Sequence, residues 1–132
     1  WAYAPASVVD TLNRIRDPFN VSSAAQAAAV AALRDKAHAA ASKAHNTKWL
    51  GWLKEKIEAV GLKVFPSVAN FVLIEFPASG PKTAAAADVF LMKRGVILRA
   101  VGAYGLPNCL RLSVGTEEGN KAAIAALEEF MS

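Results

Sequence analysis

The spacing of apolar residues changes at Gly61, and this change limits the fold more than any other feature of the 132-residue chain. Before Gly61, large apolar side chains recur at steps of three and four residues, which is the period of a helix: Trp49, Trp52, Leu53, Ile57 and Val60. After Gly61, apolar residues come in short runs and alternations, which are typical of strands. The order of helices followed by β-β-α-β-β-α predicts one α+β domain. Its small, largely antiparallel sheet is expected to be covered by helices.

The first sixty residues are expected to form three helices. The first covers Ser7–Ile15, where apolar residues fall on one side. The second runs from Ser23 to about Leu33, because Ser23 and Gln26 match a capping box. Asp35 is the predicted N-cap of a long third helix, which ends at about Val60 with Gly61 as its C′ residue.

The second half of the chain carries the strand signals. We expect strands at 63–65, 69–76, 96–99 and 110–114, and helices at 83–94 and from Thr116 onward. The run Ala69–Phe76 is apolar nearly throughout, which predicts a strand covered on both faces. The run Leu110–Val114 alternates, so its three apolar side chains face the core and Arg111 points to the opposite side.

Composition excludes several classes of function. The net charge is +4, but the basic residues are scattered without a block, so we expect no nucleic-acid partner. No apolar run approaches the ~20 residues that a membrane span needs. Cys109 is the single cysteine, so the chain can form neither an internal disulfide nor a cysteine-based metal site, and a reducing cytoplasm suits it. The sequence does not begin with methionine, which suggests a fragment or a processed product.

Two arginines offer the clearest chemistry. Arg99 and Arg111 end or interrupt short strand-like runs, and a glycine-containing loop around Tyr104 joins them. A guanidinium stays charged and presents a flat fork that binds carboxylate or phosphate with two hydrogen bonds. A surface ion pair is the alternative for each arginine. The chain carries no catalytic triad context, zinc-protease motif, dinucleotide fingerprint or P-loop, so no catalytic residue or metal site is expected.

Five motifs, taken in order, resemble the C-terminal part of the fold-type I, pyridoxal-phosphate-dependent aminotransferases. They are Arg16–Ser22 (RDPFNVS), Pro66–Leu73 (PSVANFVL), Arg94–Arg99 (RGVILR), Tyr104–Pro107 (YGLP) and Leu110–Thr116 (LRLSVGT). Within this family the chain is most similar to the histidinol-phosphate aminotransferases. The resemblance covers nearly the whole chain. It implies a helical segment over residues 1–34 that leads from the large domain, and a small domain over residues 35–132.

The resemblance also implies roles for the two arginines. In such enzymes the arginine matching Arg111 binds the substrate carboxylate, and the one matching Arg99 helps to hold the distal anion of the substrate, such as a phosphate. The implied reaction belongs to histidine biosynthesis and moves an amino group between histidinol phosphate and 2-oxoglutarate, with glutamate as the other partner. The implied enzyme is a cytoplasmic homodimer that uses pyridoxal 5'-phosphate.

The family's cofactor lysine has no counterpart here. That lysine lies in a Ser-x-Lys-x-x-Gly-Leu motif, whereas Ser42-Lys43-Ala44 lies in an expected helix with no glycine after it. This chain by itself is therefore expected neither to bind the cofactor nor to catalyse the reaction. Three alternatives stay open. They are the small domain of an aromatic-amino-acid aminotransferase, that of a threonine-phosphate decarboxylase, and a stand-alone, non-catalytic anion-binding domain.

Overall fold

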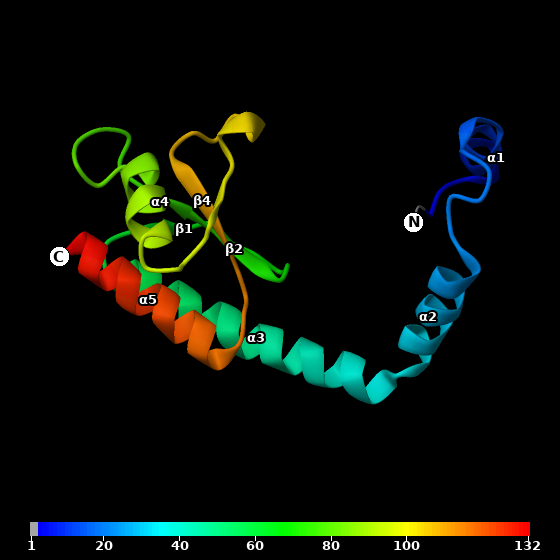
Figure 1. Cartoon of the computed structure of the whole chain (residues 1–132), viewed down its shortest axis with the longest axis horizontal. Helices are drawn as coiled ribbons and strands as arrows, with labels where there is room; N and C mark the ends of the chain where they lie inside the picture. The colour runs from blue at the N-terminus through cyan, green and yellow to red at the C-terminus, as the bar shows by residue number, and fades with distance from the viewer. Residues whose placement is uncertain (1–2) are drawn as a thin grey trace. The chain divides into compact units, whose positions relative to one another are not determined.

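A computed structural model describes residues 3–132, which divide into two compact units at Ala39 and Ala40. The first unit contains α1 (Ala6–Ile15) and α2 (Ser23–Arg34), and α3 (Lys36–Ala59) begins in it (Figure 1). Neither α1 nor α2 contains a buried residue. These helices therefore have no hydrophobic core of their own within the unit.

The cap of α2 differs from the sequence-based prediction by one residue. The Ser22 hydroxyl, and not that of Ser23, accepts a hydrogen bond from the Ala25 N–H at 3.2 Å. The Gln26 side chain donates to the Val21 carbonyl instead of closing a capping box. Two adjacent serines can each cap a helix, and the extended backbone of Ser22 decides between them.

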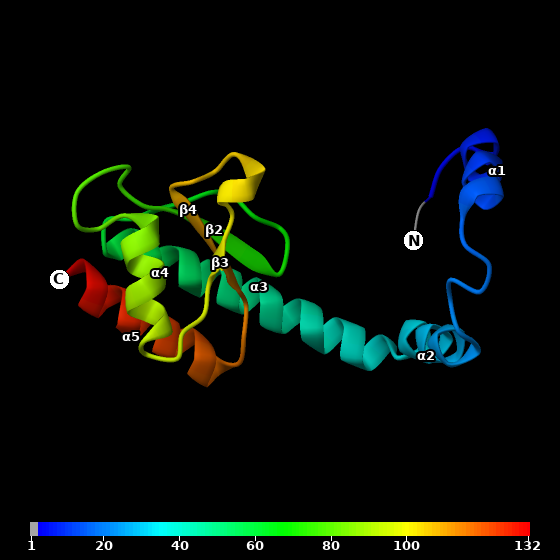
Figure 2. The same cartoon turned by 45° about the horizontal axis from the view of Figure 1, so that its top comes forward.

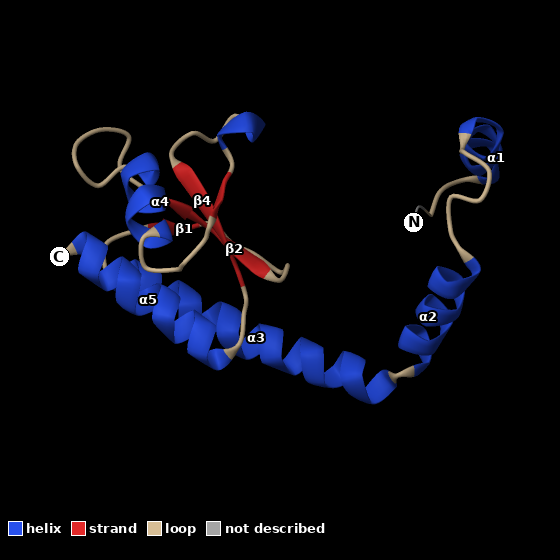
Figure 3. Ribbon diagram, viewed as in Figure 1, coloured by secondary structure: helices blue, strands red, loops and turns tan. Residues whose placement is uncertain are grey.

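The second unit is an α+β domain, as predicted (Figure 3). Its elements are α3, β1 (Lys63–Val64), β2 (Phe71–Glu75), α4 (Ala84–Met92), β3 (Arg99–Ala100), the 3-10 helix η1 (Gly102–Tyr104), β4 (Cys109–Ser113) and α5 (Glu117–Met131). The four strands lie in the order β1-β2-β4-β3, and all three neighbouring pairs are antiparallel. The prediction of a largely antiparallel sheet is confirmed.

Helix ends follow the sequence signals closely. Gly61 has a φ of +84°, its N–H bonds to the Glu58 carbonyl, and the Leu62 N–H bonds to the Ile57 carbonyl. This pair of bonds is a Schellman motif and confirms Gly61 as the C′ residue. Thr116 caps α5 with its hydroxyl, as its position before two glutamates indicated.

The strand at 96–99 was predicted too early. The Val96 N–H bonds to the Leu91 carbonyl and so closes the end of α4, and the observed strand is only Arg99–Ala100. A backbone group that caps a helix cannot also pair in a sheet. The arginine nonetheless lies in the strand.

The core lies between the sheet and its helices. Helices α3 and α5 run side by side along the sheet, and α4 packs beside α5 (Figure 2). One cluster joins the buried face of the sheet to these helices: Val72, Ile74, Leu110 and Leu112 from the strands, with Leu53, Ile57, Ala87, Leu91, Ile124 and Leu127 from the helices. The apolar stripe predicted on α3 is confirmed, because Trp49, Leu53 and Ile57 are buried.

The opposite face of the sheet is only half-buried. Phe71, Leu73 and Glu75 alternate with the buried residues of β2, so the expectation of a strand covered on both faces is wrong for this unit. The three helices of Ala40–Ser132 contribute to the core cluster on one face of the sheet. The other face carries half-buried side chains such as Leu73 and its cross-strand partner Arg111. No helix within residues 3–132 is long and apolar enough to cross a membrane.

Candidate anion-binding site

Strand pairing brings the two predicted arginines together. In the β3–β4 ladder, Arg99 is the direct partner of Arg111. Directly opposed residues of an antiparallel pair project to the same face, with their Cβ atoms about 4.5–5.5 Å apart. The side chains of these two arginines, twelve residues apart in sequence, therefore project side by side from the same face of the sheet.

The two side chains open onto a groove of about 530 Å³ on the second unit. Its lining comes from the β3 and β4 region: Ile97, Leu98, Arg99, Ala100, Arg111, Leu112 and Ser113. Leu98 and Leu112 are buried in the core, so the apolar floor of the groove is held by the fold. The two arginines are the charged residues among those that line the groove.

Arg111 is half-buried and held at one side. Its guanidinium carbon lies 5.1 Å from the centre of the Phe71 ring, within the range of a cation–π contact. Its Nε is buried without a hydrogen-bond partner in the described chain. A charged donor without an acceptor costs free energy, and a bound oxygen acceptor would remove that cost.

Arg99 is exposed and has a different partner. Its Nη2 donates a hydrogen bond to the Tyr104 hydroxyl at 3.3 Å. Tyr104 belongs to η1, the short turn that follows β3. The structure thus adds Tyr104 and Phe71 to the two arginines predicted from sequence. Phe71 pairs with Ser113 across β2 and β4 and is therefore diagonal to Arg111. The sequence of either strand alone does not give this register.

Neither arginine of the pair is neutralised by an acid within residues 3–132. The ion pairs in this range are Lys54–Glu58, Lys63–Glu75, Arg94–Glu129 and Lys121–Glu117. Within residues 3–132, neither Arg99 nor Arg111 forms the surface ion pair that was the alternative interpretation. Two like charges directly opposite each other destabilise a sheet, and an anion between them would reverse this effect.

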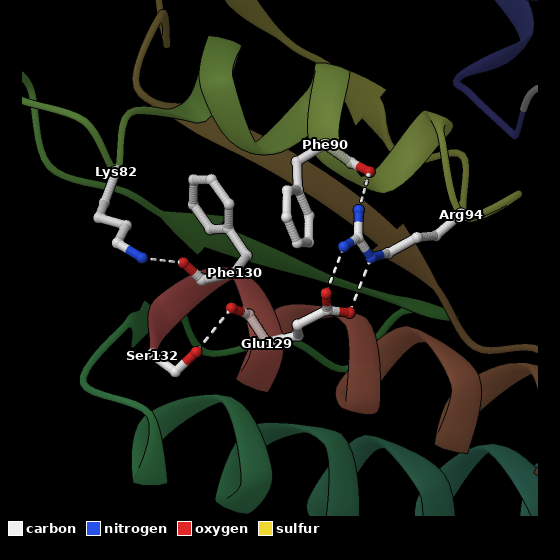
Figure 4. Close-up of polar contacts among 6 residues, drawn as sticks. All are labelled: Lys82, Phe90, Arg94, Glu129, Phe130 and Ser132. Carbon is white, nitrogen blue, oxygen red and sulfur yellow. Dashed lines mark hydrogen bonds and ion pairs between the residues drawn. The ribbon is translucent and has the colours of Figure 1, made fainter.

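Arg94 shows the contrasting case of an arginine with a structural role (Figure 4). Its guanidinium fork bonds both carboxylate oxygens of Glu129 and lies 3.5 Å from the centre of the Phe90 ring. The hydrogen bonds from Arg94 hold the pKa of Glu129 below its ordinary value, and Glu129 raises the pKa of Arg94. Arg94 thus joins α4 to α5 and offers no free fork to a ligand.

Cys109 is buried at the start of β4. Burial is the main cause that raises the pKa of its thiol, and the negative charge of Glu75 adds to this. The neutral thiol form is therefore favoured, and Cys109 is a packing residue rather than a nucleophile.

Comparison with known proteins agrees with the family suggested by the motifs. The model of the family "Aminotransferase class I and II" matches residues 1–127. Histidinol-phosphate aminotransferases of Nitrobacter hamburgensis and Rhodopseudomonas palustris BisB18 are 54% and 53% identical to the chain over all 132 residues. The chain spans 36% of the length of each of these relatives.

Solved structures share the fold. A crystal structure from Burkholderia pseudomallei K96243, described as an aminotransferase, superposes with a TM-score of 0.83 at 29% identity. The match covers 97% of this chain and 38% of that one. A decarboxylase from Sulfurospirillum multivorans gives a TM-score of 0.76 at 21% identity over 96% of this chain and 37% of that chain, which shows the fold alone.

Proposed function

The chain belongs to the class I and II aminotransferases, and we propose that it forms the C-terminal part of a histidinol-phosphate aminotransferase. Relatives of that name match its whole length at 53–54% identity. The proposed reaction transfers an amino group between histidinol phosphate and 2-oxoglutarate. In the proposed enzyme, this chain supplies substrate-binding arginines, and its site is completed by the large domain of the same polypeptide.

The observation that carries this proposal is the pair of arginines without acidic partners on one face of the sheet. Both proposed substrates carry two anionic charges at neutral pH or close to it, as a dicarboxylate or a phosphate monoester. Arg111, restrained beside Phe71, is suited to hold a carboxylate with its fork. Arg99, at the exposed edge strand, is suited to the distal anion. A dicarboxylate bound to both arginines would neutralise the two cations that repel each other in the free protein.

The residues described here do not fit pyridoxal phosphate as a group held by this chain alone. The cofactor acts as an electron sink and is held through a lysine Schiff base and an acidic partner of its ring nitrogen. The groove contains neither a lysine nor an acid among its lining residues in the described chain. Lys43, the lysine that follows a serine as in the family motif, is exposed on α3. We therefore propose that the cofactor site lies in the part of the relatives that this chain does not span.

The 132-residue chain on its own is therefore proposed to be inactive. Mixing the purified chain with pyridoxal phosphate should give no new absorption band of a lysine-bound cofactor and no amino transfer. Amino transfer by the chain without a helper polypeptide would contradict this proposal.

The complete enzyme is proposed to be a cytoplasmic homodimer. Exposed apolar side chains of α1 and α2, such as Ile15 and Leu33, support the need for a covering partner, and light scattering tests the dimer.

The test of the site is Arg111→Ala in the full-length enzyme that carries this chain. Loss of a charge-assisted contact of about 1.5–3 kcal/mol predicts a roughly ten- to hundredfold lower kcat/KM for glutamate and 2-oxoglutarate. Lys93→Ala is the control, because Lys93 is an exposed cation of the same unit and is not one of the groove's lining residues. An unchanged kcat/KM for the dicarboxylate would remove Arg111 from the site. A substrate panel with aromatic amino acids and threonine phosphate distinguishes the alternative activities.

A further inference from the structure

Tyr104 is the phenol that stands beside the arginine pair. The residue is 67% exposed, and its hydroxyl accepts the hydrogen bond from Arg99 Nη2 at 3.3 Å. The two residues are five positions apart, on either side of the sharp turn from β3 into η1. Tyr104 is not itself a lining residue of the groove, but it contacts Arg99, which lines the groove and is the proposed ligand of the distal anion.

The hydrogen bond leaves the phenol proton available. A guanidinium has only donors, so the Tyr104 oxygen is the acceptor in its contact with Arg99. A hydroxyl has one donor hydrogen in addition to its lone pairs, and no acceptor for this hydrogen occurs in the part of the chain that the structure describes. The positive charge of Arg99 polarises the hydroxyl and strengthens it as a donor. The pair therefore presents N–H and O–H donors to the same region.

The turn around Tyr104 is held by its own backbone. The Tyr104 N–H bonds to the Val101 carbonyl, and the Gly105 N–H bonds to the Gly102 carbonyl, each at 3.0 Å. Gly105 takes the left-handed conformation with a φ of +78°, which ends the 3-10 turn. These bonds keep the tyrosine beside Arg99.

We propose that Tyr104 positions Arg99 and donates a hydrogen bond to the distal anion, so that this end of the site prefers a phosphate monoester over a carboxylate; the proposal rests on the proposed function. A carboxylate has two oxygens, and one guanidinium fork pairs with both. A phosphate monoester has three terminal oxygens, so a third donor is needed after the fork. The Tyr104 O–H supplies that donor.

The test uses the full-length enzyme with its cofactor and compares Tyr104→Phe, Arg99→Gln and the double variant. Tyr104→Phe is expected to raise KM for histidinol phosphate about tenfold, as loss of one hydrogen bond to a charged group predicts, with kcat within about twofold of wild type. KM for glutamate should rise less than KM for histidinol phosphate, because the fork of Arg99 pairs with both oxygens of a carboxylate without the third donor. Because the tyrosine acts partly through Arg99 and partly by its own hydrogen bond, the double variant should be more impaired than Arg99→Gln but less than the product of both single effects.

Leu106→Ala is the matched control, because Leu106 lies in the same loop and makes no polar side-chain contact. If this control raises KM for histidinol phosphate as much as Tyr104→Phe does, the effect comes from the loop and the proposal is overturned. An unchanged KM for histidinol phosphate in Tyr104→Phe, or equal increases for both substrates, also overturns it while the proposed function stands.

If the wild-type enzyme does not transaminate histidinol phosphate, the proposed function fails and the role of Tyr104 is decided by binding alone. Titration calorimetry with inorganic phosphate then compares the wild-type protein with Tyr104→Phe. Binding that is several-fold weaker in the variant supports the tyrosine as an anion ligand. Equal binding by the two proteins, or no binding by the wild type, overturns the proposal.

Discussion

Arg99→Gln is expected to stabilise the protein when no anion is bound. Arg99 and Arg111 are direct cross-strand partners, and neither has a carboxylate partner within residues 3–132. Cross-strand pairs change the stability of a sheet by roughly 0.2–1 kcal/mol, and like charges act against it. Glutamine removes the charge and keeps a side chain of similar length. We therefore expect the free energy of unfolding to rise by about 0.2–1 kcal/mol, less the small contribution of the exposed hydrogen bond to Tyr104.

Urea denaturation of the 132-residue chain measures this change. The variant should show a higher midpoint at an unchanged m-value, because the charge is removed from a folded surface without a change in the area exposed on unfolding. The gain should be largest at about 10 mM salt, where the Debye length is about 30 Å, and should vanish at about 1 M, where it is about 3 Å. Phosphate should stabilise the wild type more than the variant, since a ligand that binds only the folded state raises its stability.

Lys93→Gln separates the local repulsion from the general effect of a net charge of +4. It removes one exposed cation of the same unit that lies outside the arginine pair. Arg99→Gln must gain more stability than Lys93→Gln at low salt for the reasoning to hold. An equal gain, a loss of stability at low salt, or a gain that persists at high salt would refute the repulsion between Arg99 and Arg111.

Three further predictions concern the fold around the site. Gly61→Ala should lower the free energy of unfolding by about 1–2 kcal/mol in urea denaturation, because the φ of Gly61 is +84°. Gly51→Ala in α3 has open space around the added methyl and should raise that free energy by about 0.5–1 kcal/mol. Equal effects of the two variants would contradict the assignment of Gly61 as the cap. Arg94 lowers the pKa of Glu129, so this pair contributes stability that is present above the ordinary glutamate pKa and is lost as pH falls through the lowered value. In a pH series of melting curves, Glu129→Gln should therefore show a smaller loss of stability toward low pH than the wild type. The Cys109 thiol should react with a thiol reagent only as the protein unfolds in urea, because burial raises its pKa and covers it; rapid labelling of the native protein would count against this.

Local sequence signals predicted the helices and their ends well. Residues in the stripe of α3 repeat at helical spacing, and the burial of Trp49, Leu53 and Ile57 follows from that spacing. Gly61 marks the end of α3 because a left-handed residue there satisfies two backbone groups. The capping serine of α2 was missed by one position because either neighbour has the chemistry of a cap, and only the backbone conformation distinguishes them.

The two candidate arginines could be chosen from the sequence, and their role stays a prediction, but their arrangement could not be predicted. Alternation in β4 places Arg111 on the face away from the core, and this orientation is local information. The pairing of Arg111 with Arg99 and the approach of Phe71 depend on the register between three strands, which is a property of the tertiary fold. The half-exposed second face of β2 could not be predicted either, because an apolar run does not reveal how many layers cover it.

The same alternation explains how a small sheet tolerates two unpaired cations. On one face, the strands bury Val72, Ile74, Leu110 and Leu112, and complete burial of such a side chain contributes about 1.5–3 kcal/mol. On the other face, the repulsion in the arginine pair costs at most about 1 kcal/mol. The burial term exceeds the repulsion several-fold, so the strand that anchors the core can also hold Arg111 ready for an anion. The fold therefore holds the two guanidiniums in place without a ligand, and an anion bound between them would supply the neutralising charge.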